Sequence, residues 1–451
     1  MVGRVNSTVK GASLRLGVIG TGYLGAVHAA CMADLGHEVI GLDTDQERVN
    51  SLNRGVAPIY EPGLDDLLKK TLATGRLRFT SDVVETAKGA DIHFICVGTP
   101  QKEGSNAADL TYVWSAVEHL STHLNDGALV VGKSTVPVGT AEEVAKRVAQ
   151  LSPPGTNVEV AWNPEFLREG FAIADTVSPD RLVIGVRSTE AEDRLRGVYR
   201  VILEKGTPMV VTDFATAELV KVAANAFLAT KISFINAMAE ICEVTGANVT
   251  ELANAIGQDP RIGSRFLRAG IGFGGGCLPK DIRAFMARAE ELGLAESLAF
   301  LTEVDAINQR RRDTATKYVT DMLENRVEGS VVAVLGAAFK PDSDDVRDSP
   351  ALFVADKLRA MGATVRVHDP RAQHNAKRNY PQLEYPPSVE ETVVGADIVL
   401  HMTEWAEYRH LNPIEISKLV RHKRIFDGRN ELDLKQWQAA GWATKSLGRP
   451  Q

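Results

Sequence analysis

The chain has 451 residues, which is too long for one compact core and indicates two or three domains. Hydrophobic residues make up 44% and charged residues 24%, as in ordinary globular proteins. The formal net charge of −7 argues against a nucleic-acid binder, which would carry a basic excess. We find no apolar stretch near the roughly 18 residues of a membrane span, so no membrane contact is expected.

The cysteines and the N-terminus bear on the cellular location. Cys31, Cys96, Cys242 and Cys277 show no short paired spacing, so neither a disulfide scaffold nor a metal site is expected. Residues 1–13 are polar and lack the apolar segment of a secretory signal, so we expect a disordered arm there. These features predict a cytoplasmic α/β protein.

The first part of the chain alternates apolar strands with helical patterns. A strand over 14–19 runs into Gly20-Thr21-Gly22-Tyr23-Leu24-Gly25, and a helix follows. Further strands are expected at 38–43, 91–97 and 128–131. This alternation predicts a parallel, doubly wound sheet, and we assign residues 14–212 to this domain.

The glycine loop predicts dinucleotide binding. Gly20, Gly22 and Gly25 supply the tight turn, the close approach to a pyrophosphate, and close helix–strand packing. The helix that follows offers free N–H groups to the phosphates. Asp43 ends the next strand, where an acceptor for the ribose 2′-hydroxyl belongs, which favours NAD over NADP. Arg48 nearby weakens that preference.

The middle of the chain is helical and the opening pattern then returns. Residues 214–244 contain no Pro or Gly and predict one long buried helix within a central domain, 213–325. Strands at 331–336 and 363–369, the second also ending in Asp, predict another nucleotide-binding-like domain over 326–451. The fold class is therefore α/β, with two Rossmann-like domains joined by a long central helix and a helical middle segment.

Cys277 is the strongest candidate nucleophile. It follows the glycines of Gly272-Phe273-Gly274-Gly275-Gly276, and Pro279 predicts that a helix begins beside it. A helix N-terminus and the neighbouring Lys280 both lower the pKa of a thiol. Asp281 lies four residues beyond the sulfur. The other three cysteines are more simply read as small core residues.

The long helix carries a second polar group. Lys221 and Asn225 are one turn apart, with Glu218 and Lys231 nearby on the same helix. A cation and an amide that share a face can stabilise an oxyanion. The alternative is a solvated helix edge.

Seven motifs together resemble the UDP-glucose 6-dehydrogenase family, in order from about Leu14 to Arg429. They are Gly20-Thr21-Gly22-Tyr23-Leu24-Gly25, Glu61-Pro62-Gly63-Leu64, Cys96-Val97-Gly98-Thr99-Pro100, Ser134-Thr135-Val136-Pro137-Val138-Gly139-Thr140, Asn163-Pro164-Glu165-Phe166-Leu167-Arg168-Glu169, residues 272–281 and Phe339-Lys340-Pro341-Asp342. The resemblance implies that NAD binds the first domain and a UDP-sugar the last. It implies a four-electron oxidation of UDP-glucose at C6 to UDP-glucuronate, with two NAD consumed per sugar.

The resemblance also implies residue roles. Cys277 would hold a thiohemiacetal and then a thioester, Lys221 and Asn225 would stabilise the oxyanion, and Asp281, Glu165 and Thr135 would handle protons and water. The implied cofactor contacts are Gly20, Gly22, Tyr23, Leu24, Gly25, Asp43, Arg48, Thr99, Thr135, Glu169, Lys280 and Arg347. The implied substrate contacts are Glu165, Phe166, Leu167, Arg168, Lys221, Asn225, Arg261, Phe266, Leu267, Arg268, Ala269, Gly270, Gly274, Phe339, Lys340 and Arg429.

The cysteine loop departs from the family at two positions. Gly276 stands where serine is common, and Leu278 stands where phenylalanine is common. Leu278 is also found in GDP-mannose 6-dehydrogenases, so GDP-mannose or another nucleotide hexose stays open as the substrate. UDP-N-acetyl-sugar dehydrogenases usually carry a histidine at the position of Gly276, so that branch is not expected. The nucleotide base and the downstream pathway are not readable.

Two other protein classes and the oligomeric state complete the expectations. A two-electron hydroxyacid dehydrogenase gives no reason for Cys277, and a non-catalytic NAD(H) sensor leaves Lys221, Asn225, Cys277 and Asp281 as coincidences. Because apolar residues cover more than one face of 214–244, we expect a homodimer or larger oligomer. The resemblance adds that Arg261 reaches a neighbouring subunit's sugar site.

Overall fold

The computed structural model describes residues 13–450, so the expected arm over 1–13 lies outside the described residues except for Ser13. The described chain forms two compact units. The first comprises residues 13–103 and 108–221, and the second comprises 104–107 and 222–450. The helices of the expected central domain fall mainly in the second unit, and the three-domain division stays a prediction.

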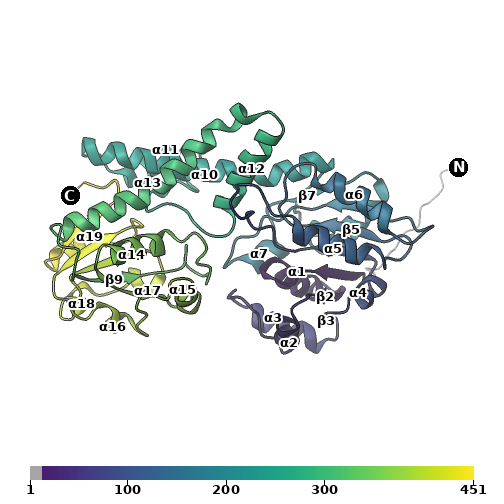
Figure 1. The fold of residues 1–451 in the computed structure, drawn as a ribbon, viewed down its shortest axis with the longest axis horizontal. Coiled ribbons are helices and arrows are strands. Elements are labelled where there is room, and N and C mark those ends of the chain that lie inside the picture. The colour runs from purple at the N-terminus through teal and green to yellow at the C-terminus, as the bar shows by residue number, and fades with distance from the viewer. Residues whose placement is uncertain (1–12, 451) are drawn as a thin grey trace. The chain divides into compact units, whose positions relative to one another are not determined.

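The first unit is built on an eight-stranded sheet with the order β3-β2-β1-β4-β5-β6-β7-β8 (Figure 1). Every pairing is parallel except β6 with β7. The strands are β1 (Arg15–Ile19), β2 (Glu38–Leu42), β3 (Leu77–Thr80), β4 (Ile92–Ile95), β5 (Leu129–Gly132), β6 (Glu159–Trp162), β7 (Leu182–Gly185) and β8 (Met209–Thr212). The helices are α1 (Tyr23–Asp34), α2 (Gln46–Asn53), α3 (Leu64–Ala73), α4 (Val83–Gly89), α5 (Thr111–Ser121), α6 (Thr140–Leu151), α7 (Ala172–Val177), α8 (Thr189–Val198) and α9 (Arg200–Glu204).

Both faces of this sheet are covered because alternate strand residues point to opposite sides. Leu16 and Val18 of β1 belong to a core cluster that includes residues of α1. Ile19 of β1 and Ile95 of β4 belong to a different cluster, with residues of α5 and α6. The predicted doubly wound α/β fold is therefore confirmed for this unit.

Two fully buried histidines make the stability of the first unit pH-dependent. Burial lowers the pKa of His28 well below its usual value and lowers that of His93 to about 4. Neither ring nitrogen of His28 has a hydrogen-bond partner within residues 13–450. The unfolded chain, with a histidine pKa of about 6.5, therefore binds more protons than the folded chain below that pH.

We therefore expect the free energy of unfolding to be fully present above pH 6.5 and to fall as the pH drops. The loss should approach about 1.4 kcal/mol per histidine for each pH unit below about 6.5. Urea denaturation at several pH values between 7.5 and 5.5 measures this loss of unfolding free energy. Carboxylates with ordinary pKa values do not titrate in this range. His28→Leu should flatten the profile, and an unchanged slope would contradict this assignment.

A 32-residue helix, α10 (Phe214–Thr245), begins in the first unit and continues into the second. It confirms the predicted long helix. By length and composition α10 could cross a membrane, which corrects the expectation that no stretch is long enough. Its buried residues include Glu218, Lys221, Asn225 and Asn236, and buried polar residues that bond within a protein are typical of a core helix.

The remaining helices of this region and a five-stranded parallel sheet complete the second unit. The helices are α11 (Val249–Gly257), α12 (Leu278–Glu291), the short 3₁₀ helix η1 (Ala295–Leu298), α13 (Ala299–Met322), α14 (Pro350–Ala360), α15 (Gln373–Asn379), α16 (Val389–Val393), α17 (Ala406–Arg409), α18 (Pro413–Ile416) and α19 (Leu434–Ala439). The strands are β9 (Val331–Leu335), β10 (Thr364–His368), β11 (Ile398–His401), β12 (Arg424–Asp427) and β13 (Ala443–Ser446), in the order β10-β9-β11-β12-β13.

This second sheet begins like the first, and the carboxylate after β10 is bound by the chain itself. Asp369, which follows β10, accepts hydrogen bonds from the N–H groups of Ala337 and Ala338 and from the Trp405 indole. Its other oxygen accepts from the N–H groups of Arg371 and Ala372. Asp43 of the first unit also accepts hydrogen bonds from the chain, so the two sheets differ instead in the loop, where Gly336-Ala337-Ala338 lacks the full dinucleotide fingerprint.

Candidate functional site

The glycine loop of the first unit has the geometry of a phosphate site. Gly20 has a φ of +87°, and a side chain on Gly25 would meet the Gly20 carbonyl oxygen at 1.8 Å. The helix α1 begins at Tyr23, and its N-cap residue Gly22 offers no side chain to the free N–H groups. An open helix N-terminus and close backbone approach fit a dinucleotide pyrophosphate.

Asp43 stands beside this loop at the end of β2. It is 6% exposed and accepts hydrogen bonds from the Thr21 N–H at 2.8 Å and from the Arg48 guanidinium at 3.0 Å. Burial opposes the carboxylate charge, but bonds from the Asp45 and Thr21 N–H groups and from Arg48 outweigh it, so the pKa of Asp43 is lowered. An ionised acceptor therefore stands where a ribose would lie, with Arg48 paired to it.

The loops after β4 and β5 bring two more expected cofactor residues together. The Thr99 hydroxyl donates to the Thr135 carbonyl at 2.7 Å, and the Ser134 hydroxyl donates to the Val97 carbonyl at 2.7 Å. Both loops leave the same carboxyl edge of the sheet as the glycine loop, because β1, β4 and β5 are parallel. Ligands of such sheets bind at this edge.

Lys133 was not anticipated from the sequence. It follows β5, is 5% exposed, and its Nζ lies 2.9 Å from Glu165 Oε2 and 3.2 Å from Asn163 Oδ1. Burial opposes its charge, yet Glu165 and its other neighbours raise the pKa of Lys133. The other Glu165 oxygen accepts from the N–H groups of Phe166 and Leu167 at 2.6 and 2.8 Å. The Glu165 carboxylate is thus fixed from three directions.

Glu61, which belongs to the motif Glu61-Pro62-Gly63-Leu64, links two segments of the first unit. Its carboxylate, 6% exposed, accepts from the Tyr23 hydroxyl and from the N–H groups of Gly170 and Ala172 at 2.6 and 2.7 Å. Burial and this bond to Glu61 raise the pKa of Tyr23. Glu61 therefore ties the glycine loop to the segment that contains Glu169. In the sequence, the only indication of this linking role was a carboxylate placed directly before Pro62 and Gly63.

The polar residues of α10 lie in both units. Glu218 accepts from the N–H groups of Gly139 and Ala141 at the start of α6, and Lys221, 7% exposed, lies 5.4 Å from the Phe166 ring centroid. Both expected oxyanion donors, Lys221 and Asn225, are buried on the helix rather than solvated. The reading of a solvated edge is therefore wrong for them.

Asn225 lies next to the candidate nucleophile in the second unit. Its Nδ2 donates to Asp281 Oδ2 at 2.6 Å, and Lys280 Nζ donates to Asp281 Oδ1 at 2.6 Å. Asp281 is 2% exposed, whereas Cys277 is exposed and caps the N-terminus of α12. The predicted helix beside Cys277 is confirmed. The thiol thus lies at the positive end of a helix dipole, and the buried Asp281 on the first turn of that helix joins the Asn225 amide of α10 to the half-buried Lys280 ammonium.

Arg347 lies over the residue before this cysteine. Its guanidinium pairs with Asp345 at 2.7 Å, and Asp345 also accepts from the Gly276 N–H at 3.2 Å. A side chain at Gly276 would lie 2.1 Å from the Arg347 Cζ. The departure at Gly276 therefore leaves room for Arg347, and Asp345 is a further residue that the sequence did not single out.

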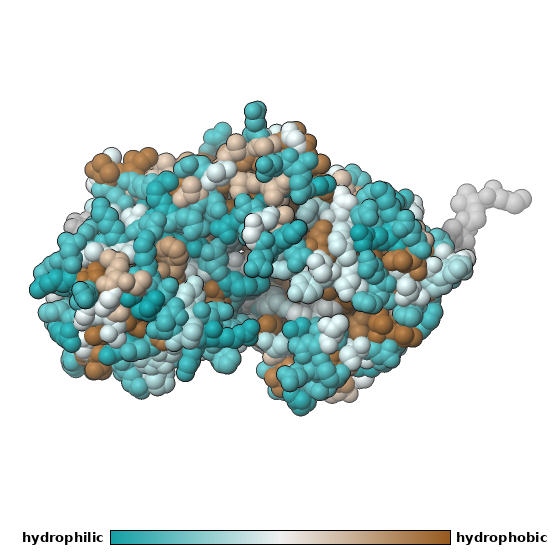
Figure 2. Space-filling view, in the orientation of Figure 1, coloured by the Kyte–Doolittle hydropathy of each residue, from teal (hydrophilic) through white to brown (hydrophobic). Residues whose placement is uncertain are grey.

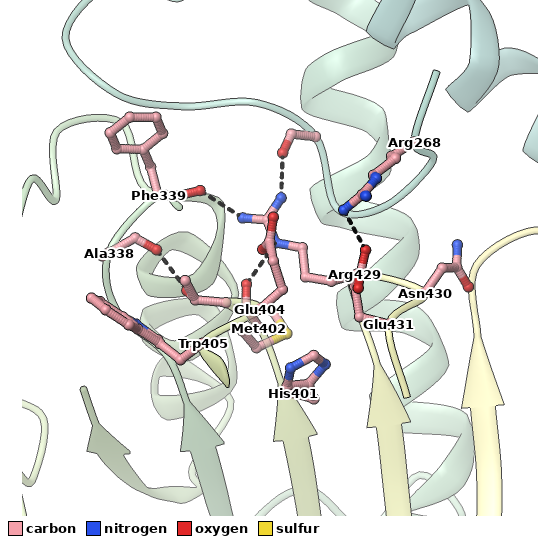
Figure 3. Close-up of polar contacts among 12 residues, drawn as sticks. Arg268, Ala338, Phe339, His401, Met402, Glu404, Trp405, Arg429, Asn430 and Glu431 are labelled. Atoms are coloured by element: carbon pink, nitrogen blue, oxygen red, sulfur yellow. Dashed lines mark hydrogen bonds and ion pairs between the residues drawn. The ribbon is translucent and has the colours of Figure 1, made fainter. Parts of the chain in front are cut away.

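Arg429 connects several loops at the carboxyl edge of the second sheet (Figure 3). Its guanidinium donates to the carbonyls of Met402 at 2.8 Å, Gly272 at 3.0 Å and Phe339 at 3.0 Å. Burial lowers its pKa, although Glu404, 3.4 Å away, opposes that shift. Arg429 thus joins the cysteine loop to the loop that carries Lys340.

The segment 266–270 is held by its neighbours. Phe266 has a φ of +65° and is 37% exposed, and Arg268 pairs with Glu431 at 2.6 Å. Leu267 and Ala269 are buried in the core against α10, so only their main chain can face a ligand.

Two expected substrate residues are engaged at the surface. Arg168 pairs with Asp175, and Arg261, 88% exposed, pairs with Asp259. Among residues 13–450 no three His, Cys, Asp or Glu side chains gather as a metal site would require.

Comparisons with known proteins agree along nearly the whole chain. The profiles of the NAD binding, central and UDP binding domains of the UDP-glucose/GDP-mannose dehydrogenase family match residues 14–203, 215–310 and 333–434. A UDP-glucose 6-dehydrogenase of Rhizobium meliloti is 41% identical over 439 residues, 97% of this chain and 100% of that protein. The solved UDP-glucose dehydrogenase of Pyrobaculum islandicum is 36% identical, with a TM-score of 0.90 and coverage of 99% and 100%. The solved structure of a UDP-D-ManNAc dehydrogenase from Pyrococcus horikoshii is 32% identical in sequence, with a TM-score of 0.84, and the match covers 97% of this chain and 99% of that one.

Proposed function

Because the chain belongs to the UDP-glucose/GDP-mannose dehydrogenase family, we propose that it oxidises the C6 alcohol of UDP-glucose to the carboxylate of UDP-glucuronate. It is an NAD-dependent nucleotide-sugar dehydrogenase. The observation that carries the proposal is the exposed Cys277 thiol at the N-cap of α12, whose first turn carries Asp281 bonded to Asn225 and Lys280.

The covalent step divides the oxidation in two. NAD, when bound, accepts one hydride in each oxidation. The C6 alcohol first loses a hydride and a proton and becomes an aldehyde, to which the Cys277 thiolate adds, so that a C–S bond forms in a thiohemiacetal. Loss of the second hydride from C6, together with the hydroxyl proton, leaves a thioester. Water then breaks the C–S bond, which releases the carboxylate and restores the thiol, and the aldehyde is never free to escape.

Five groups of the chain would serve the charges and protons of these steps. Lys221 and Asn225 are buried donors suited to an oxyanion, and Asp281 orients the Asn225 amide by accepting its N–H. Glu165, fixed by Lys133, is a carboxylate suited to take protons, together with Thr135 and a water molecule.

The ligand contacts are proposed from the family motifs and the geometry above. For NAD they are the loop Gly20, Gly22, Tyr23, Leu24 and Gly25, with Asp43, Arg48, Thr99, Thr135, Glu169, Lys280 and Arg347. For the UDP-sugar they are Glu165, Phe166, Leu167, Arg168, Lys221, Asn225, Arg261, Phe266, Leu267, Arg268, Ala269, Gly270, Gly274, Phe339, Lys340 and Arg429.

Counting the NADH released per UDP-glucose tests this function directly. Two NADH per sugar are expected from the four-electron oxidation. One NADH would indicate a two-electron dehydrogenase, and none would indicate an NAD(H)-binding protein without this activity. Either result would overturn the proposal.

GDP-mannose and other nucleotide hexoses are the second candidate substrates, because Leu278 departs from the family at a position beside the thiol. They require the same mechanism. We expect UDP-glucose to have the highest kcat/KM in a panel with GDP-mannose, TDP-glucose and UDP-N-acetylmannosamine. A higher value for GDP-mannose would move the assignment to that branch.

Cofactor choice should depend on Asp43. Its ionised carboxylate repels a 2′-phosphate and keeps Arg48 paired, so NAD should be preferred over NADP. Asp43→Ala should lower the ratio of kcat/KM for NAD to kcat/KM for NADP by at least about tenfold, since placing the like charges of a carboxylate and a 2′-phosphate together costs several kcal/mol. Asp45→Ala is the matched control, because Asp45 caps α2 and also lies near Arg48. Equal use of NADP by the unchanged enzyme would show that Arg48 dominates.

We also propose that the enzyme is a homodimer or larger, with α10 at the interface. Four large apolar residues on the part of this helix in the second unit are exposed, among them Phe227 at 66% and Phe234 at 49%. The others are Ile241 and Val244. Phe227, Phe234 and Ile241 are seven residues apart and share one face, and Figure 2 shows hydrophobic side chains gathered over the ends of α10 and α11. An apolar face of this kind indicates a protein partner.

Phe234→Glu should therefore convert the oligomer to monomers and lower activity, as measured by sedimentation and assay at one concentration. Phe300→Glu is the control, because Phe300 is 53% exposed on a different helix, α13. Arg261→Ala should raise the KM for the sugar more than the KM for NAD. A fully active monomer at assay concentration contradicts this proposal.

We propose a cytoplasmic location because of the state of the cysteines. All four are free thiols, three of them buried, as a reducing compartment favours. Fractionation of the producing cells tests it.

A further inference from the structure

In the cysteine loop, residues 272–276, the second residue, Phe273, is hydrogen-bonded to the side-chain amide of Asn308 on α13. Asn308 Oδ1 accepts from the Phe273 N–H at 2.8 Å, and Asn308 Nδ2 donates to the Phe273 carbonyl at 3.0 Å. Asn308 is 0% exposed. A carboxamide that bonds both the N–H and the carbonyl of one residue imitates the pairing of a neighbouring strand, and it fixes the main chain of that residue in place and in orientation.

A second residue one turn along α13 completes this clamp. The Arg312 guanidinium donates to the same Phe273 carbonyl at 3.0 Å and pairs with Asp348 at 2.7 Å. Arg312 is 2% exposed. Asp348 belongs to the same loop as Arg347, whose carbonyl accepts from the Gly275 N–H at 2.8 Å. The loop before Cys277 is thus held from α13 and from residues 345–348 together.

The clamp also explains two of the loop's glycines. Gly272 has a φ of +97°, and a side chain there would lie 2.4 Å from Asn308 Oδ1. A side chain at Gly274 would lie 2.3 Å from the Asp348 carbonyl oxygen. These glycines are needed for the close approach of the loop to its supports, independently of any ligand.

We propose that Asn308 is a positioning residue for the reaction, which fixes the main chain of Phe273 and thereby the Cys277 thiol at the head of α12. Only three residues lie between Phe273 and Cys277, so a shift of the Phe273 main chain is passed to the sulfur through a short segment. Both polar atoms of the Asn308 side chain are engaged by Phe273, so its effect on the sulfur is transmitted through the loop. The inference rests on the proposed nucleophilic role of Cys277, and its test is chosen to separate the two.

The first measurement compares Asn308→Ala with a matched control. Asn53 makes the same two bonds to Phe79 of β3, at 2.9 and 2.8 Å, away from the cysteine loop. Asn308→Ala should lower kcat about 10- to 100-fold, because small misplacements of reacting groups have effects of this size, while both KM values change less than about threefold. Asn53→Ala should keep kcat within about twofold, whatever its effect on Tm.

The second measurement follows the thiol itself, without catalysis. Iodoacetamide should modify Cys277 selectively, because the other three cysteines are buried. In Asn308→Ala the midpoint of the pH dependence of alkylation should rise and the rate at pH 7 should fall, since the thiol is no longer held at the helix N-terminus. Asn53→Ala should match the unchanged enzyme.

Asn308→Asp keeps the test decisive if Asn308→Ala does not fold. It retains the acceptor for the Phe273 N–H and lies near Arg312, so it should fold and show smaller changes in the same directions. Unchanged kcat and alkylation in a folded Asn308 variant, or a kcat loss without any alkylation change, would overturn the proposal. One NADH per sugar would instead overturn the proposed function. The alkylation result would still show whether Asn308 positions the Cys277 thiol.

Discussion

Cys277→Ser is expected to lower overall turnover at least about a thousandfold, while NAD and UDP-glucose still bind. The serine hydroxyl is a far weaker nucleophile than a thiolate at neutral pH, and the ester it would form is hydrolysed more slowly than a thioester. The helix N-terminus and Lys280, which favour a thiolate, cannot ionise an alcohol. Steady-state NADH production measures the loss, and calorimetric titration measures binding of each ligand.

Cys242→Ala is the matched control for that experiment. Cys242 is 2% exposed on α10 and lies in a hydrophobic cluster away from the cysteine loop. Its replacement should cost some stability and leave kcat within about twofold. If Cys277→Ser kept even a tenth of the original rate, the covalent mechanism would have to be abandoned.

Lys221→Met should lower kcat by about a hundred- to a thousandfold, the usual effect of removing one donor to an oxyanion. Methionine keeps an apolar stem that can pack against Phe166 and removes only the charge and its N–H donors. The KM for NAD should change little, since Lys221 is not among the proposed cofactor contacts. Initial rates at saturating UDP-glucose measure the effect.

Lys357→Met controls for the loss of a lysine as such. Lys357 lies on α14 and pairs with Asp313 at the surface, so its removal should leave kcat within about twofold. A Lys221→Met enzyme with unchanged kcat would show that the buried ammonium serves the fold and not the oxyanion.

Local patterns predicted the parts of the site whose residues are close together in the chain. The glycine loop, its strand and its helix are one continuous motif, and Asp43 ends the next strand. Cys277, Pro279 and Asp281 likewise share one helix start, so their proximity follows from the spacing alone. The long helix was predictable because it lacks Pro and Gly over 32 residues.

The residues that support the site could not be predicted in this way. Glu61 bonds to a residue 111 positions away, and Asn308 bonds to one 35 positions away. In the sequence a lone glutamate or asparagine looks like a surface residue, because its burial is decided by tertiary packing. Lys133 was equally hidden, since its carboxylate partner lies on a different loop of the sheet edge.

The ion pair between buried Lys133 and half-buried Glu165 limits how this sequence can change over time. Losing Glu165 alone leaves the buried Lys133 charge without its carboxylate partner, at a cost of about 3–5 kcal/mol, whereas replacing both with apolar residues can be nearly neutral for the fold. A viable path that removes the pair must therefore change both codons almost together, and it would forfeit the fixed carboxylate. Among descendants of this chain the two positions should covary, and libraries that randomise only one of them should return the original residue.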